Sequence, residues 1–244
     1  MQADNNVSVE QPTISITALV GLPEISVGDN LADLILDGFE LFRYDVIVVT
    51  QKIVSKAEGR TASIDTTMPL QPQLDAIIES ESRRIIRKRN GLLITETHSG
   101  FVCANAGIDQ SNMPAGTIGL LPKDPDRSAR RIRDRIMAKT GLQVGVIISD
   151  TFGRNWRRGV QDVALGVAGI AALVDLRGSL DAQGRELSAT QIALADELAG
   201  AAELVKSKAA NIPVVLIRGV PTRHFRESSI ATEVVRPFSE DLFR

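Results

Sequence analysis

Short apolar runs alternate with amphipathic segments along the chain, a pattern that is typical of α/β proteins. Residues 45–50 and 144–148 are almost wholly apolar and rich in β-branched side chains, which predicts strands covered on both faces. Residues 13–20 alternate polar and apolar positions as a half-buried strand does, and residues 212–217 form the last clear strand. We expect residues 45–50 to be central in their sheet.

Apolar residues at helical spacing predict four helices. A short helix is expected after a cap at Gly28 and Asp29. Residues 74–89 predict a helix that ends in a basic turn, and residues 126–139 predict a strongly charged amphipathic helix. Residues 187–206 predict a long core helix. The fold class that follows is mixed α/β (α+β), with sheets and flanking helices.

Two further segments have a specific expected structure. Residues 92–96 and 101–104 predict a hairpin around a four-residue turn that contains His98. The hairpin runs into a polar loop, residues 105–112, which we treat as a candidate site. Residues 163–173 are mostly small, and this suits close approach of one backbone to another.

Composition limits the protein class. The chain has 244 residues and a net charge of −2, which gives no bias toward nucleic acid. We expect a flexible leader at residues 1–11 and a single domain at residues 12–244. Cys103 is the single cysteine, so no intrachain disulfide can form. No apolar run approaches the roughly 20 residues of a membrane span, and we expect a soluble, cytoplasmic protein.

Several common catalytic motifs are absent from the sequence. It contains no Walker-type phosphate loop, no Gly-x-Gly-x-x-Gly after a strand and no Cys/His cluster. The two histidines, His98 and His224, lie in separate loops, and no Gly-x-Ser-x-Gly elbow is present, which argues against a Ser-His-Asp hydrolase. A bound nucleotide must therefore be held in some other way.

The segment that follows the apolar run at residues 144–148 carries candidate chemistry. Asp150 and Thr151 come directly after the predicted strand, and Arg154, Arg157 and Arg158 follow a turn glycine. Ligands of α/β proteins collect where strands end in loops, so an acid and a hydroxyl there indicate a metal or phosphate site. The alternative interpretation is a strand end followed by a helix cap and a solvated basic turn.

A second group of polar residues complements this segment. Asp109 and Asn112 lie in the loop at residues 105–112, and Lys52 and Lys56 follow the strand at residues 45–50. Oxygen ligands with nearby cations are what a site for Mg²⁺ or Mn²⁺ with a polyphosphate requires. Taken singly, Asp109 also fits an Asx turn, and Lys56 also fits a solvated charge.

Taken together and in order, these motifs resemble those of one family. The matching stretches include Gly21-Leu22-Pro23-Glu24, residues 48–52 and 55–60, Ala106-Gly107-Ile108-Asp109-Gln110-Ser111-Asn112, residues 121–126, 149–159 and 184–187. The chain resembles the coenzyme F420-0:L-glutamate ligases over nearly its whole length. The resemblance implies GTP-dependent addition of glutamate to a deazaflavin coenzyme through an acyl phosphate.

The resemblance also assigns roles to individual residues and implies partners. It implies nucleotide contacts at Leu22, Pro23, Glu24, Ile25, Gln51, Lys56 and Asn112, and divalent-metal ligands at Asp109, Asp150 and Thr151. Lys56, Asp109 and Asp150 are then the expected catalytic residues. Arg154, Arg157 and Arg158 are the nearest cations for the acidic coenzyme. Mg²⁺ or Mn²⁺, K⁺ as an activator, and an intertwined homodimer are further implications, with no nucleic-acid or membrane partner.

One departure from the family leaves alternatives open. Residues 206–210 read Lys-Ser-Lys-Ala-Ala, where some relatives have a Gly-rich acidic turn that binds nucleotide and a second metal. The number of metal ions is thus open. One alternative is a ligase of the same fold for another acceptor or amino acid. Another is a nucleotide-binding regulatory protein without turnover.

Overall fold

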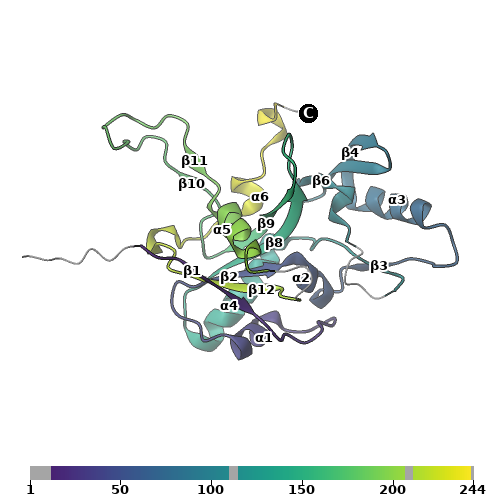
Figure 1. Cartoon of the computed structure of the whole chain (residues 1–244), viewed down its shortest axis with the longest axis horizontal. Helices are drawn as coiled ribbons and strands as arrows, with labels where there is room; N and C mark the ends of the chain where they lie inside the picture. The colour runs from purple at the N-terminus through teal and green to yellow at the C-terminus, as the bar shows by residue number, and fades with distance from the viewer. Residues whose placement is uncertain (1–11, 110–114, 207–210, 243–244) are drawn as a thin grey trace, which may run out of the picture.

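A five-stranded mixed sheet forms the centre of the molecule (Figure 1). The computed structural model describes residues 12–109, 115–206 and 211–242. The strand order is β1 (Ser15–Leu19), β12 (Val214–Arg218), β2 (Val46–Thr50), β8 (Gly145–Gly153) and β9 (Val160–Ala168). Strands β2 and β8 are parallel, and the other neighbours are antiparallel. The strand predicted to be central therefore lies in the middle of the sheet.

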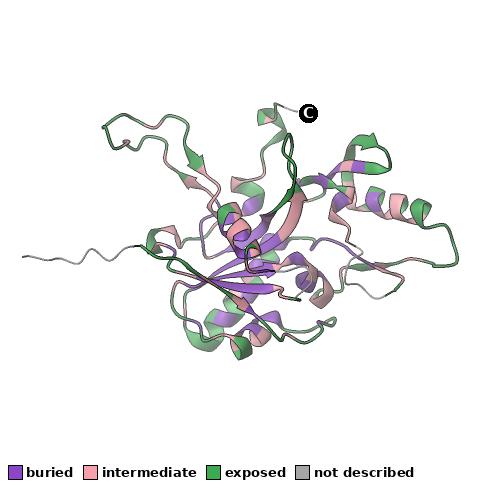
Figure 2. Ribbon diagram, viewed as in Figure 1, coloured by how far each residue is buried: buried purple, intermediate pink, exposed green. Residues whose placement is uncertain are grey.

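Helices cover both faces of this sheet (Figure 1). The helices α1 (Leu31–Gly38), α2 (Gln51–Ala57) and α4 (Pro125–Thr140) pack on one face, and α5 (Leu194–Glu203) and α6 (Ile230–Glu233) pack on the other. Figure 2 shows the sheet as the buried layer between them. Because both faces are buried, residues 46–49 of β2 and 145–148 of β8 are continuously apolar rather than alternating. The expected mixed α+β class is confirmed.

Smaller elements surround the central sheet. A second sheet contains β4 (Ser82–Arg89), β5 (Leu92–Thr97) and β6 (Val102–Ala104), next to α3 (Leu70–Glu81). Two more strand pairs are β3 (Thr61–Ser63) with β7 (Thr117–Gly119), and β10 (Val174–Asp175) with β11 (Gln191–Ile192). The β10–β11 pair begins an arm that extends away from the body (Figure 1). No helix in the described ranges is long and apolar enough to span a bilayer.

The predicted helix at residues 74–89 is wrong in its second half. Helix α3 ends at Glu81, and residues 82–89 form strand β4, which pairs antiparallel with β5. Ile85 and Ile86 fit a helical stripe by spacing, but β-branched residues also favour strands, and the pairing with β5 decides between the two. The basic residues 87–89 therefore lie on an edge strand and do not form a helix C-terminal turn.

The predicted helix at residues 187–206 starts too early. Helix α5 begins at Leu194, because Gln191 and Ile192 pair with β10 instead. The first helix was also predicted with the wrong cap, since the Asn30 side chain, and neither Gly28 nor Asp29, accepts the backbone bonds of α1. The helix at residues 126–139 and the hairpin at residues 92–104 are confirmed.

The small-residue run packs closely, as predicted. Gly166 lies on β9 against the start of α4, and a Cβ at this position would be 2.2 Å from the carbonyl atoms of Pro125. No side chain fits in that space. The helix axis of α4 therefore sits as near to the sheet as the backbone allows.

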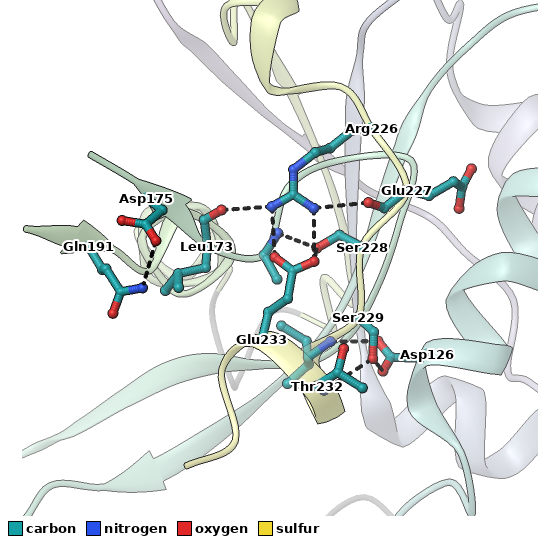
Figure 3. A network of polar contacts seen from close by, with 12 residues as sticks. Asp126, Leu173, Asp175, Gln191, Arg226, Glu227, Ser228, Ser229, Thr232 and Glu233 are labelled. Carbon is teal, nitrogen blue, oxygen red and sulfur yellow. Dashed lines mark hydrogen bonds and ion pairs between the residues drawn. The ribbon is translucent and has the colours of Figure 1, made fainter. Parts of the chain in front are cut away.

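Asp126 ties the C-terminal segment to this helix (Figure 3). Its buried carboxylate accepts hydrogen bonds from Ser229 Oγ at 2.7 Å and from the backbone nitrogens of Val167, Ile230 and Ala231 at 2.8, 3.1 and 3.2 Å. One carboxylate thus connects α4, β9 and α6. Arg226 and Glu233 form an ion pair nearby, with a nitrogen-to-oxygen distance of 2.7 Å.

Candidate functional site

A cavity of about 750 Å³ opens at the carboxyl ends of the parallel strands β2 and β8. Parallel strands commonly present ligands at this edge. Nine of the predicted site residues line the cavity: Leu22, Pro23, Glu24, Ile25, Gln51, Lys56, Asp109, Asp150 and Thr151. Asn112 lies outside the described residues. Segments as far apart in sequence as those of Leu22 and Thr151 therefore meet at one place.

Strand β8 carries the acid and hydroxyl farther than expected. Asp150 and Thr151 were predicted to lie in a loop, but β8 continues to Gly153, with Asp150 opposite Val163 and Thr151 opposite Asp162 on β9. No helix follows, so the alternative of a helix cap is wrong as well. Successive side chains of a strand point to opposite faces, and Asp150 and Thr151 therefore face different walls of the cavity.

The first wall is formed by Asp150 with Asp109 and Lys52. Lys52 Nζ lies 2.7 Å from Asp109 Oδ2. Burial raises the pKa of Asp150 to about 7, and the negative charges of Asp162 and Asp109 add to this, while a hydrogen bond from the Thr151 backbone and the charge of Lys52 oppose it. A group of acids that repel each other in this way favours a bound cation.

Cys103 lies on the same wall, although its sequence position predicts only a small residue of a strand. Burial raises the pKa of its thiol to about 12, and the negative charge of Asp150 contributes. The thiol therefore stays protonated and is a poor nucleophile. Its place in the cavity is that of a small apolar side chain.

Unusual backbone conformations precede Asp109. Asn105, Ala106 and Gly107 have φ values of 49°, 53° and 71°, in the left-handed region. Ala106 gains no benefit from this region, so the surrounding contacts must hold it there. The Ala106 backbone nitrogen donates to Thr95 Oγ1 at 3.0 Å, and Asp109 exchanges backbone hydrogen bonds with Gly119 at 2.8 and 3.0 Å. The loop is thereby fixed where Asp109 enters the cavity.

Helix α2 supplies two of the lysines that line the cavity. Lys52 and Lys56 are four residues apart and so lie on one face of the helix. The Lys56 ammonium pairs with Glu24, which belongs to the loop before α1. Gln51 is buried and accepts a hydrogen bond of 3.0 Å from Ser55 Oγ. The helix thus presents two ammonium groups to a cavity whose lining also includes the carboxylates of Glu24, Asp109, Asp150, Asp162 and Glu203.

The second wall contains a buried polar cluster that sequence reasoning did not identify. Thr151 Oγ1 donates to Asp162 Oδ1 at 2.7 Å, and Lys206 Nζ donates to Asp162 Oδ2 at 2.6 Å and to Ser149 Oγ at 2.8 Å. Asp162 and Lys206 have side-chain exposures of only 3% and 4%. The available sequence signal was Asp162, an acidic residue in the mostly apolar strand β9. Its contact with Thr151 can be recognised only when the pairing of β9 with β8 is known.

The three predicted substrate arginines do not line the cavity. Arg154, Arg157 and Arg158 lie in the exposed connection between β8 and β9, where Arg154 donates to the Arg158 carbonyl at 2.9 Å. Gly153, which precedes them, does line the cavity. The three arginines therefore lie outside the cavity, on the segment that follows Gly153.

The donor set fits a hard divalent cation. Within the part of the chain that the structure describes, no three or more His, Cys, Asp and Glu side chains are clustered so that they could hold a metal ion by themselves. Mg²⁺, however, uses only one or two carboxylates, with waters and substrate phosphates as its other ligands. Asp109 and Asp150 supply the carboxylates, and burial is the main cause of the raised pKa of Asp150.

Comparison with known proteins identifies the family of the chain. A sequence profile of the family described as "F420-0:Gamma-glutamyl ligase" matches residues 20–219. The chain belongs to this family. Residues 20–219 contain the strands, helices and cavity residues described above, apart from β1 and the C-terminal segment.

Individual relatives of this ligase family extend over most of the chain. "Coenzyme F420:L-glutamate ligase" of Methanothermobacter thermautotrophicus is 41% identical over 249 residues, which covers 95% of this chain and 99% of the relative. The proteins of the same name from Methanopyrus kandleri and Methanocaldococcus jannaschii are also 41% identical, covering 96% and 88% of this chain and 98% and 90% of the relatives. The predicted resemblance is confirmed at the level of the family.

Proposed function

We propose that this ligase joins L-glutamate to coenzyme F420-0, with GTP as the phosphoryl donor. The observation that carries the proposal is the single cavity in which α2 cations and the Asp109 and Asp150 carboxylates meet. Its volume of about 750 Å³ is within the roughly 300–1,000 Å³ usual for small-molecule sites. The names of the relatives support glutamate and the F420 coenzyme as substrates.

The chemistry requires that a carboxylate be activated before an amine can attack it. An oxygen of the F420-0 carboxylate attacks the γ-phosphorus of GTP, the bond from that phosphorus to the bridging oxygen breaks, and GDP leaves. The glutamate nitrogen then attacks the carbonyl carbon of the acyl phosphate, and the carbon–oxygen bond to phosphate breaks. The products are an amide, GDP, phosphate and one proton from the amine.

The chain contributes mainly position and charge to these steps. Lys56, which pairs with Glu24, would exchange this partner for nucleotide phosphate. Asp109 and Asp150 would hold Mg²⁺ or Mn²⁺, and the Thr151 oxygen would add a ligand from the other face of the strand end. The bound cation would offset the negative charge of the phosphates. Leu22, Pro23, Ile25 and Gln51 would contact the nucleotide along the same wall.

The acidic coenzyme needs cationic contacts of its own. Arg154, Arg157 and Arg158 follow the cavity residue Gly153 and are exposed, so a long substrate that leaves the cavity along β8 would meet them. Guanidinium groups suit carboxylates and phosphodiesters. We assign these residues to the phosphodiester and carboxylate groups of F420-0.

A product assay tests the proposal. The protein is incubated with F420-0, L-glutamate, GTP and Mn²⁺, and the coenzyme mass is followed. We expect an increment of one or more glutamyl groups and matching release of GDP. Parallel reactions contain ATP, other amino acids or other acceptors. Absence of a glutamyl increment would contradict the proposal, and GTP binding without phosphate release would favour a regulatory protein.

Two further parts of the proposal come from the family resemblance. We propose K⁺ as an activator, and a comparison of rates in KCl and NaCl tests it. We also propose a homodimer. The arm around β10 and β11 supports this, because it extends from the body and exposes Leu180. Light scattering during size exclusion checks the dimer, and a monomeric mass for the active protein would contradict it.

A further inference from the structure

The buried ion pair of Asp162 and Lys206 lines the cavity, but neither residue has a role in the proposed phosphoryl transfer or amide formation. Both residues line the cavity, and both side chains are almost fully buried. A buried ion pair is a weak source of stability, because removing two charges from water costs about as much as their attraction returns. One hydrogen bond, from Thr151 Oγ1 to Asp162 Oδ1, connects the ion pair to Thr151. This hydrogen bond indicates the function of the pair.

The direction of that hydrogen bond decides what Thr151 can do. A hydroxyl has one hydrogen and two lone pairs. An ionised carboxylate can only accept, so the Thr151 hydrogen must point to Asp162 Oδ1, where the distance is 2.7 Å. The lone pairs of Thr151 Oγ1 are then left for a ligand in the cavity that this residue lines.

Lys206 holds the Asp162 carboxylate, which determines the direction of the Thr151 hydrogen bond. Its ammonium bonds to Asp162 Oδ2 at 2.6 Å and to Ser149 Oγ at 2.8 Å, so Asp162 is held from the side away from Thr151. Ser149 also donates to Asp162 Oδ2 at 3.1 Å. Donors thus occupy both carboxylate oxygens, and the group has one orientation.

We infer that Asp162 and Lys206 are positioning residues, which keep the lone pairs of Thr151 Oγ1 directed at a divalent cation in the cavity. The inference rests on the proposed function, because it takes a cation beside Thr151 as given. Residues that orient metal ligands through hydrogen bonds typically change metal affinity by about 10- to 100-fold when they are replaced. We expect a loss in that range here.

The near-isosteric change Asp162→Asn separates positioning from simple packing. The Lys206 ammonium requires an acceptor, so the amide oxygen would turn to Lys206 and the amide NH₂ would turn to Thr151. The NH₂ group would then donate into a lone pair of Thr151 and reverse the hydrogen bond. We expect Asp162→Asn to weaken Mn²⁺ binding by about 10- to 100-fold.

A compensating variant gives a readout that a structural role would not produce. In Asp162→Asn/Lys206→Met the ammonium is gone, and the amide oxygen is free to accept from Thr151 again. We expect this double variant to recover most of the Mn²⁺ affinity that Asp162→Asn loses. Should the single variant fail to fold, the double variant carries the test alone, and binding as weak as that of Thr151→Val would overturn the inference.

The experiment measures free Mn²⁺ by electron paramagnetic resonance, in titrations of the full chain with saturating GDP. Asp196→Asn is the matched control, since Asp196 accepts a 2.8 Å bond from the Ala164 nitrogen beside the same strand but does not line the cavity. We expect wild-type affinity for it. In Thr151→Val, the further change Asp162→Asn should have no additional effect.

The outcomes distinguish this inference from the proposed function. Weaker binding in Thr151→Val with unchanged binding in Asp162→Asn would overturn the positioning role alone. Unchanged binding in Thr151→Val would overturn both the Thr151 metal contact and the positioning role. The proposed ligation fails separately, when wild-type protein binds Mn²⁺ and GDP but adds no glutamyl group to F420-0.

Discussion

Lys52 Nζ lies 2.7 Å from Asp109 Oδ2, so one of the two carboxylates on the first wall of the cavity is paired with a cation. Asp150 lies close enough to both groups for their charges to act on it, in opposite directions. Burial, together with the negative charges of Asp162 and Asp109, exceeds the opposing effects of the Thr151 backbone hydrogen bond and of Lys52, and the pKa of Asp150 rises to about 7. Metal binding and stability must therefore depend on pH near neutrality.

The contribution of Asp150 to stability should fall as the pH rises from about 4 to about 7. In this range folded Asp150 binds a proton, whereas unfolded Asp150, with the ordinary pKa of 3.8, does not. The folded state thus binds more protons, and stability decreases with pH until Asp150 ionises in the folded state as well. Thermal unfolding of wild type and Asp150→Asn across this range checks it. A similar slope in both proteins would contradict the assignment.

Mn²⁺ affinity should show the opposite trend. A carboxylate must be deprotonated to bind metal, so protons compete with Mn²⁺ below a pH of about 7. We expect affinity to rise roughly tenfold per pH unit below that value, when one proton is displaced, and to level off above it. Calorimetric titration at several pH values measures this. A flat profile would mean that Asp150 is ionised throughout, or is no ligand.

Lys56→Met should weaken GTP binding. The ammonium is largely buried and pairs with Glu24, and a phosphate in its place would gain a charge-assisted hydrogen bond. Loss of such a bond costs about 1.5–3 kcal/mol, or roughly 10- to 100-fold in affinity. Lys139→Met is the control, because Lys139 pairs with Asp33 at 2.8 Å on the surface. Equal GTP affinity in both variants would remove Lys56 from the nucleotide site.

The exposed arginines should affect the acceptor substrate and not the nucleotide. Replacing Arg154, Arg157 or Arg158 by Ala is expected to raise the KM for F420-0 by roughly 1.5- to 5-fold each, since exposed ion pairs contribute about 0.2–1 kcal/mol. The KM for GTP should not change. Arg135→Ala, which removes a surface pair with Asp33, is the control. An unchanged KM for F420-0 in the triple variant would refute the assignment.

Asp150 and Thr151 could be recognised as site residues from sequence, although they were predicted to lie in a loop and not in β8, but the second wall was not predicted. Asp150 and Thr151 stand out because a polar pair follows an apolar run, which is a local signal. The role of Asp162 depends on its contacts with Thr151 on the neighbouring strand and with Lys206 on a distant segment. Such a contact depends on register and tertiary packing, which a single sequence does not specify.

The fold shows the same division between local and distant information. Central strands and helix α4 carry strong periodic patterns, and they were predicted correctly. Residues 82–89 were predicted as helix because their isoleucines continue a helical stripe, yet pairing with β5 makes them a strand. Gln191 and Ile192 were predicted to be helical for a similar reason, but they form strand β11 and pair with β10. Long-range pairing overrides local periodicity in both segments.

Gly166→Ala should destabilise the protein. The added Cβ would lie 2.2 Å from the Pro125 carbonyl, and backbone atoms cannot move aside as a flexible side chain can. Overpacking of this kind costs about 1–3 kcal/mol or more. Gly153→Ala on β8 is the control, because its Cβ would meet no atom within 4 Å. Equal unfolding midpoints in urea for the two variants would show that α4 shifts without cost.

Asp126→Asn should lower stability while leaving nucleotide affinity intact. The carboxylate accepts four hydrogen bonds from α6, its preceding serine and β9, and an amide has one accepting oxygen (Figure 3). Its NH₂ group would face donors in a buried site, and each unsatisfied group there costs about 1–3 kcal/mol. For a chain of this size, 1 kcal/mol shifts Tm by about 2–4 °C. We therefore expect a Tm lower by several degrees in calorimetry.

Since Asp126 does not line the cavity, GTP affinity measured below the transition should equal that of wild type. A wild-type Tm would show that the C-terminal segment is held by its apolar contacts, Ile230 foremost, rather than by this carboxylate.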